Sequence, residues 1–157
     1  MRSSSIQFTV DIAGERQLSR TLHGLLGRVA DWRPVFEAIA EDWSESRAAT
    51  FGQEGAFEGG RKWAPLSERY ARWKARHFPG MPILQRTGAL QRATTQPVTE
   101  LSAQQLVLTI DNDYAVYHQS PAPRQVLPRR PFASLTRLQR GRWVGILRRH
   151  IWGEDTA

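Results

Sequence analysis

The side chains in this sequence that could hold a metal are few and widely spaced. The four histidines are His23, His77, His118 and His150, and none lies within four residues of another, as the histidines of a helical zinc site do. The chain has no cysteine, which removes cysteine zinc sites, iron–sulfur clusters, disulfides and cysteine nucleophiles. A zinc site would need carboxylates brought to a histidine by the fold, and we expect neither a metal nor a cofactor.

Carboxylates are the other candidates, because a muramidase needs two acids flanking the sugar, one of them in an apolar pocket. Glu41, Asp42 and Glu45 share one predicted helix and are typical of a solvated face. Glu54 and Glu58 stand in a glycine-rich loop, a poor place to hold a fixed geometry. The chain also lacks the Walker, GxSxG and GxGxxG motifs. We therefore predict that the protein is not an enzyme, with hydrolysis a minor alternative.

The basic charge of the chain comes from 20 arginines against two lysines, for a net charge of +7. Arginine binds carboxylate or phosphate through two parallel hydrogen bonds. The charge is segregated: residues 1–60 and 93–123 are net acidic, whereas residues 61–92 and 124–149 are strongly basic. Such blocks indicate either a nucleic-acid footprint or subunits that meet basic face to acidic face.

Four sequence motifs follow one another through the middle of the chain. They are WAPL at 63–66 with Lys74 eight residues on, ILQRTGAL at 83–90, YAVYHQ at 114–119 and PRRPF at 128–132. Their order and spacing resemble the phage virion morphogenesis family, which groups tail-completion proteins of temperate phages with the virion assembly protein of Mu-like phages. The chain is more distantly similar to neck or tail-completion proteins of long-tailed siphophages. One departure is Ser120-Pro121, where the family pattern leads us to expect a glycine.

The resemblance implies a structural protein of the virion, assembled in the host cytoplasm and acting at the head–tail junction (neck) or the upper end of the tail. It implies a ring of copies around the tail axis, with six as the expected number. The expected partners are a connector, head-closure or tail-terminator protein, with non-specific contact to packaged DNA as an option and no membrane. Two alternatives stay open: a capsid-assembly factor absent from the mature virion, and a sequence-independent nucleic-acid-binding protein.

The resemblance also marks a set of positions that we expect to act as architecture. They are Trp63, Pro65, Leu66, Lys74, Leu84, Thr87, Gly88, Leu90, Tyr114, His118, Gln119, Arg130, Pro131 and Phe132. The residue types agree with this role: Trp63 suits a buried loop anchor, Gly88 a tight turn, and Phe132 the first apolar residue of the last helix. We predict that Trp63 is largely buried.

The elements that position these residues indicate an α+β class, with a small, mostly antiparallel sheet and long helices packed on one side. We treat residues 1–157 as one domain. Helices are predicted from Leu18 to about Asp31, from Pro34 to about Phe51, over 68–78, as a short turn or helix over 83–93, and over 132–151. Long interaction loops are expected at 52–62, where four glycines indicate flexibility, and at 119–131, which is rich in proline.

Strands are predicted where apolar and polar residues alternate. Residues 6–12 read as one strand, and residues 105–118 as a hairpin that turns at Asp111 and Asp113. Pro97 reduces residues 94–101 to an edge strand at best. No apolar run is long enough to span a bilayer, and the first residues lack the apolar core of a secretory signal.

Two charged stripes complete the prediction. The last helix should carry arginines opposite its apolar face, namely Arg137, Arg140 and Arg148. The helix that starts at Pro34 carries acids at similar spacing, namely Glu37, Glu41 and Glu45. We expect the arginine stripe to meet either the acidic stripe of a neighbouring subunit or DNA in the lumen of a ring, and we favour the first.

Overall fold

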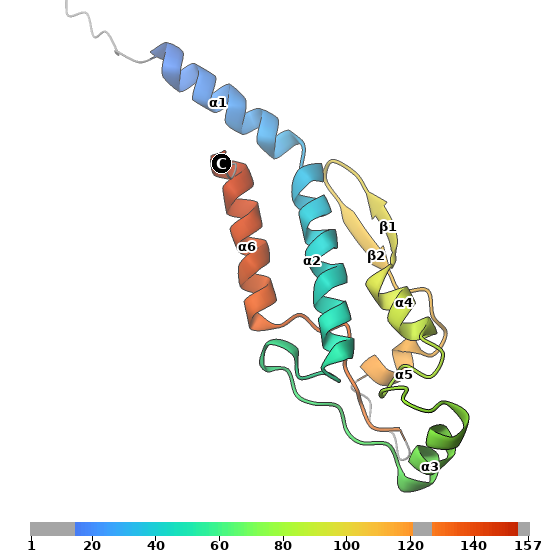
Figure 1. The fold of residues 1–157 in the computed structure, drawn as a ribbon. Coiled ribbons are helices and arrows are strands. Elements are labelled where there is room, and N and C mark those ends of the chain that lie inside the picture. Colours follow the sequence, from blue (N-terminus) through green and yellow to red (C-terminus); the bar gives the residue numbers. More distant parts are fainter. Residues whose placement is uncertain (1–14, 121–126, 154–157) are drawn as a thin grey trace, which may run out of the picture.

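A computed structural model describes residues 15–120 and 127–153 (Figure 1). Its elements are α1 (Glu15–Ala30), α2 (Arg33–Gly52), the 3-10 helix η1 (Phe57–Gly59), α3 (Glu68–His77), α4 (Ala89–Thr95), β1 (Val98–Leu101), β2 (Leu106–Thr109), α5 (Ala115–Gln119) and α6 (Arg137–Trp152). The fold is therefore α+β with helix dominant, as predicted, although the sheet of the described part has only two strands. The predicted strand at 6–12 lies outside the described residues.

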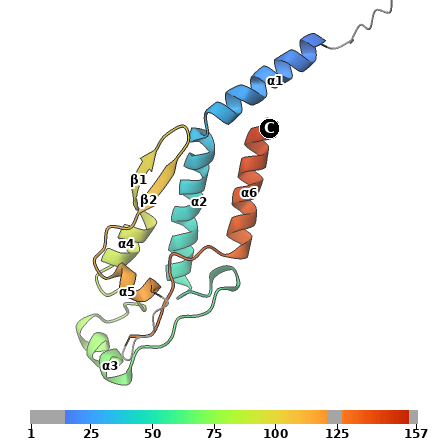
Figure 2. The ribbon, with the colours of Figure 1, turned by 180° about the vertical axis from the view of Figure 1, so that it is seen from behind.

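Helix α2 is the central support of the molecule. Pro34 stands in its first turn, where a missing backbone N–H costs nothing. Val35, Ile39, Trp43 and Phe51 recur at helical spacing and are buried. The helix lies between α6 on one side and α4 with the hairpin on the other (Figures 1 and 2). Both helix boundaries agree closely with the prediction.

Helix α1 extends beyond the rest of the molecule (Figure 1). Three of its apolar side chains, Leu22, Leu26 and Val29, are exposed. The helix is tied to α6 near its own end, where Arg28 Nε donates to the Ile151 carbonyl at 3.0 Å. The His150 ring lies within hydrogen-bond distance of the Arg28 carbonyl. The predicted helix is confirmed, but much of its apolar side has no partner in the described chain.

The hairpin is displaced from its predicted position. Strands β1 and β2 pair antiparallel, with Val98 opposite Thr109 and Leu101 opposite Leu106. The predicted second strand, residues 114–118, instead falls in the turn and the short helix α5. So short an apolar run fits a strand or one helical turn equally well, and Pro97 is compatible with a strand that begins just after it.

Helix α6 begins five residues later than predicted. Its N-cap is Thr136, whose hydroxyl accepts a hydrogen bond from Gln139 N at 2.9 Å. Phe132 is buried but lies before the helix. Trp143, Ile146 and Leu147 are half-buried, as predicted for the apolar face. Leu138 was wrongly assigned to that face: it lies about 140° around the helix from Trp143 and is 60% exposed, whereas the polar Gln139 is buried.

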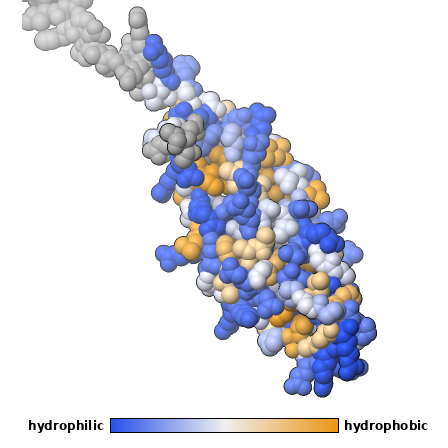
Figure 3. Space-filling view, viewed as in Figure 1, coloured by the Kyte–Doolittle hydropathy of each residue, from blue (hydrophilic) through white to orange (hydrophobic). Residues whose placement is uncertain are grey.

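Polar side chains cover most of the face seen in Figure 3, with small apolar patches between them. Among the described residues, no helix is both long and apolar enough to cross a bilayer. A cluster of three or more histidine or acidic side chains suited to a metal ion is likewise absent from residues 15–120 and 127–153.

Candidate functional site

Residues from three of the family motifs lie together in an aromatic core. Phe51, Trp63, Leu90 and Phe132 form one buried cluster, although they come from four distant parts of the sequence. Trp63 is 4% exposed and meets the Phe51 ring edge-on, with 5.4 Å between ring centroids. The predicted burial of Trp63 is confirmed.

The loop before Trp63 is built to hold it. Trp63 N donates to the Glu54 carbonyl at 2.7 Å, and its indole Nε1 donates to the Pro131 carbonyl at 2.9 Å. Gly55 has a φ of +92°, and a Cβ there would lie 2.6 Å from the indole ring. Gly55 is required at its position because the backbone passes close to the indole there, and the stretch continues through η1.

Arg130 fastens the PRRPF motif to two other motifs. Its side chain is buried and donates from Nε to the Ala64 carbonyl at 2.9 Å and from Nη2 to the Pro65 carbonyl at 3.0 Å. Its backbone N donates to the His118 carbonyl at 3.1 Å. Two residues on, Phe132 N donates to the Gln119 side chain at 3.0 Å. Burial lowers the pKa of Arg130 from its ordinary value.

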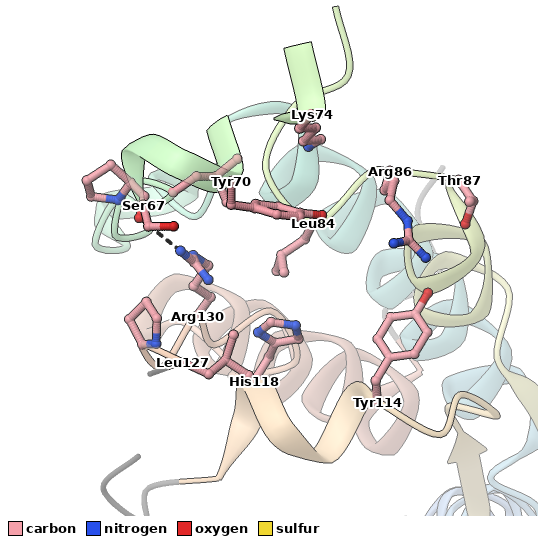
Figure 4. A pocket seen from close by; sticks show the side chains of 13 residues that line it. Ser67, Tyr70, Lys74, Leu84, Arg86, Thr87, Tyr114, His118, Leu127 and Arg130 are labelled. Carbon is pink, nitrogen blue, oxygen red and sulfur yellow. Dashed lines mark hydrogen bonds between the residues drawn. The ribbon is translucent and has the colours of Figure 1, made fainter. Parts of the chain in front are cut away.

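Other motif residues surround a cleft of about 700 Å³ between α3, the turn before α4, α5 and residues 127–130 (Figure 4). Eight of the predicted positions line it: Pro65, Leu66, Lys74, Leu84, Thr87, Tyr114, His118 and Arg130. The other five lining residues are Ser67, Tyr70, Arg86, Leu127 and Pro128. Arg86 and Pro128 stand in two of the motifs but were not among the positions marked as architecture, and no role was predicted for Tyr70 and Leu127. Gly88 stands at the N-terminus of α4 with a φ of +71°, which agrees with the predicted tight turn.

The cleft is electropositive. Lys74, Arg86 and Arg130 line it, and no carboxylate is among its described lining residues. Lys74 is 4% exposed, and its Nζ donates to the Pro82 carbonyl. Burial lowers the pKa of Lys74, and Arg130 and Arg86 lower it further, against an opposing effect from Glu54. The sequence predicted two basic blocks, and only the fold brings Arg86 of one block and Arg130 of the other to the same cleft.

His118 occupies this electropositive cleft as a partly buried imidazole. Burial lowers the pKa of His118 from its ordinary value of 6.5, and Arg130 adds to the effect. Its Nδ1 is buried and has no hydrogen-bond partner in the described part of the chain. The neutral form is therefore the one that the folded protein favours.

We predict that His118→Gln makes folding stability less sensitive to acid. Because the pKa of His118 is lower in the folded state, the unfolded chain takes up a proton first, and stability falls as the pH drops below about 6.5. Melting temperatures measured from pH 7.5 to 5.5 should fall less steeply in the variant than in the wild type. Parallel curves for the two proteins would show that His118 does not titrate in this way.

A second polar site, between α2 and α6, was missed by the sequence reasoning. Arg47 is 1% exposed and donates from Nη1 to the Phe132 and Ser134 carbonyls at 2.8 and 2.9 Å. Its Nη2 donates to Gln139 Oε1 at 2.7 Å, and its guanidinium lies over the Trp43 ring. Arg47 lies four residues after Trp43 and four residues before Phe51, so it shares the buried face of α2 with them. This spacing is the sequence signal from which the burial of Arg47 could have been predicted.

Arg142 ties two candidate acids into this region. Its Nε donates to Asp42 at 2.7 Å, and it also pairs with Glu58. Asp42 further accepts from Gln139 at 3.0 Å and from the Trp143 indole at 2.7 Å. The expected solvated face is thus wrong for Asp42, and the loop residue Glu58 is held in place.

These contacts bear on the hydrolase alternative. Burial raises the pKa of Asp42, but the hydrogen bonds from Arg142, Gln139 and Trp143 outweigh it and leave the pKa lowered. A general acid in a glycoside hydrolase needs a raised pKa. The environment of Asp42 is therefore that of a structural carboxylate.

The two charged stripes lie on the surface. Arg137, Arg140 and Arg148 are exposed on α6, as predicted, and Glu37, Glu41 and Glu45 are exposed on α2. Within the described part of the chain, no ion pair joins one stripe to the other. Both stripes are thus exposed on the surface of the described chain.

The comparisons with known proteins agree with the motifs. The family model for the phage virion morphogenesis family matches residues 14–151. No curated protein and no solved structure matches the chain. The matched range contains the aromatic core, the cleft and the Arg47 site, so it covers the whole arrangement described above. On this match over most of its length, the chain belongs to the phage virion morphogenesis family.

Proposed function

We propose that this protein is a non-enzymatic component of a ring at the head–tail junction or the upper end of a phage tail, acting in tail completion or as part of the neck. Membership of the family makes it a virion morphogenesis protein, with a structural role in assembly. The observation that best supports the finer role is that the motif residues serve as buried ties and as the wall of a cleft. None of these contacts pairs a nucleophile with a base within the described residues.

The proposed ring is built from heterologous contacts, in which one face of a subunit meets a different face of the next. The exposed stripes of α2 and α6 supply opposite charges for such a contact, and neither is neutralised by the other within one subunit. Charge complementarity of this kind fixes register and rejects wrong partners. The further partners are a connector, head-closure or tail-terminator protein.

A particle-composition experiment tests this role. Purified virions, and heads and tails separated from them, are compared by quantitative mass spectrometry. The proposal expects several copies in each intact virion, retained with the tail or the junction. Presence in assembling heads but absence from mature virions would support the capsid-assembly alternative.

The arginine stripe gives a second prediction. The triple variant Arg137→Ala, Arg140→Ala and Arg148→Ala should fold normally, because all three side chains are exposed. We expect this variant to fail to enter particles. A control triple variant on α3, with Arg69, Arg72 and Arg76 changed to alanine, should enter particles at a copy number close to that of the wild type. The measurement is the copy number per particle by mass spectrometry.

The same variant also tests contact with DNA, which the exposed stripe favours as a second candidate. Arginines that line a ring lumen would meet phosphates without regard to sequence, in a salt-dependent manner. Normal incorporation with premature loss of packaged DNA would overturn the subunit-contact assignment and support the lumen.

A further inference from the structure

We propose that the cleft is the docking site for the segment Trp152–Asp155 of a neighbouring copy. This inference rests on the proposed ring and names the contact that would close it. The cleft is one partner of the contact, and the residues that end α6 and follow it are the other.

The cleft has the chemistry of a receptor for an apolar and acidic peptide. Leu66, Leu84 and Leu127 supply an apolar lining, and Lys74, Arg86 and Arg130 supply positive charge with no carboxylate among the described lining residues. Lys74 and Arg130 already donate to backbone carbonyls, so Arg86, which is exposed, is the cation most available to an incoming group. Figure 4 shows Arg86 beside Tyr114 at one side of the cleft.

The segment after α6 has the complementary chemistry. Trp152 is 71% exposed, more than any other large hydrophobic side chain in the described residues. In the sequence it is followed by Gly153 and then by two adjacent acids, Glu154 and Asp155. An indole suits the apolar lining, and the two carboxylates suit the arginine and lysine side chains.

The positions of the two partners require that they belong to different copies. In both views the C-terminal end of α6 lies far from α3 and α5, the helices that border the cleft (Figures 1 and 2). Helix α6 alone, with 16 residues, spans about 24 Å. Residues 153–155 reach at most about 11 Å beyond it. A contact between two different regions of identical subunits is heterologous, the type from which rings are built.

A phosphate backbone fits the cleft less well than a peptide does. Nucleic acid binding without sequence preference uses an open basic surface, or a groove with aromatic stacking platforms. Here Tyr70 and Tyr114 are lining residues, but Tyr70 already stacks on Trp73, and leucine and proline side chains form the rest of the apolar lining. We therefore assign the cleft to protein and leave duplex DNA as an outcome of the test.

Binding of a labelled peptide to the full chain tests the assignment. The probe is a fluorescent peptide with capped ends that carries residues 150–156, followed by fluorescence anisotropy at low salt. We expect saturable binding that Arg86→Glu weakens at least tenfold. The control, Arg69→Glu, removes an exposed arginine of α3 that does not line the cleft, and it should leave the affinity within about twofold.

A charge swap makes the result specific. A peptide with Glu154→Lys and Asp155→Lys should bind the Arg86→Glu protein better than the wild type. Melting temperatures establish that each protein variant is folded. The assignment is overturned if the folded wild type does not bind the peptide, if Arg86→Glu leaves its affinity unchanged, or if a DNA duplex occupies the cleft in its place. Incorporation of the protein into particles without peptide binding would contradict this contact alone and leave the proposed function standing.

Discussion

Replacing Trp63 with alanine should lower the free energy of unfolding by about 3–5 kcal/mol, the range found for buried large aromatic side chains. The indole is 4% exposed and packs against Phe51. Without the indole, the Pro131 carbonyl would also lose the hydrogen bond that it accepts from Trp63 Nε1. Chemical denaturation of the purified protein measures the effect, and assembly should fail because the subunit misfolds.

Trp152→Ala is the matched control for this prediction. It removes the same side chain from a position that is 71% exposed, so the free energy of unfolding should change by no more than about 0.5 kcal/mol. If Trp63→Ala instead melted like the wild type and still failed to assemble, Trp63 would be a contact residue and its assignment to the core would be wrong.

Replacing Arg47 with methionine should cost about 3 kcal/mol, because two buried acceptors lose their donor and each unsatisfied buried group costs about 1–3 kcal/mol. The buried acceptors are the Phe132 carbonyl and the side chain of Gln139, and the carbonyl of the exposed Ser134 also loses its donor. They connect α2 to the segment that leads into α6. Hydrogen exchange should therefore show faster exchange of the amides at the start of α6.

Arg69→Met serves as the control for Arg47, since Arg69 is exposed on α3 and should tolerate the change. Equal stability of the two variants would contradict the assignment of Arg47 as a buried tie. An unchanged exchange rate at the start of α6 would do the same.

The parts of this fold that could be predicted are those where one physical signal dominates. Helix α2 was predicted because its apolar residues keep a regular period over five turns and Pro34 marks its start. Trp63 was predicted to be buried because a large aromatic side chain that follows a glycine-rich loop can anchor that loop against the core. The charged stripes were predicted because exposed positions of a helix follow from its period.

The parts that failed depend on contacts that the sequence does not display. Residues 114–118 form a short apolar run that suits a strand, yet the partner strand of β2 comes from 98–101, so tertiary pairing decided the outcome. Helix α6 starts at the cap Thr136, whose hydroxyl was not weighed against the more conspicuous Phe132. The joining of the motifs around one cleft was not predicted, because it depends on the path of the backbone between them.

The proposed ring at the head–tail junction or the upper end of the tail can be observed directly. The measurement is a localised cryo-electron microscopy reconstruction of the junction in intact virions. We expect a closed ring of copies around the tail axis, in which the exposed face of α6 meets the acidic face of α2 in the next subunit. A single asymmetric copy, or a junction from which the protein is absent, would contradict it.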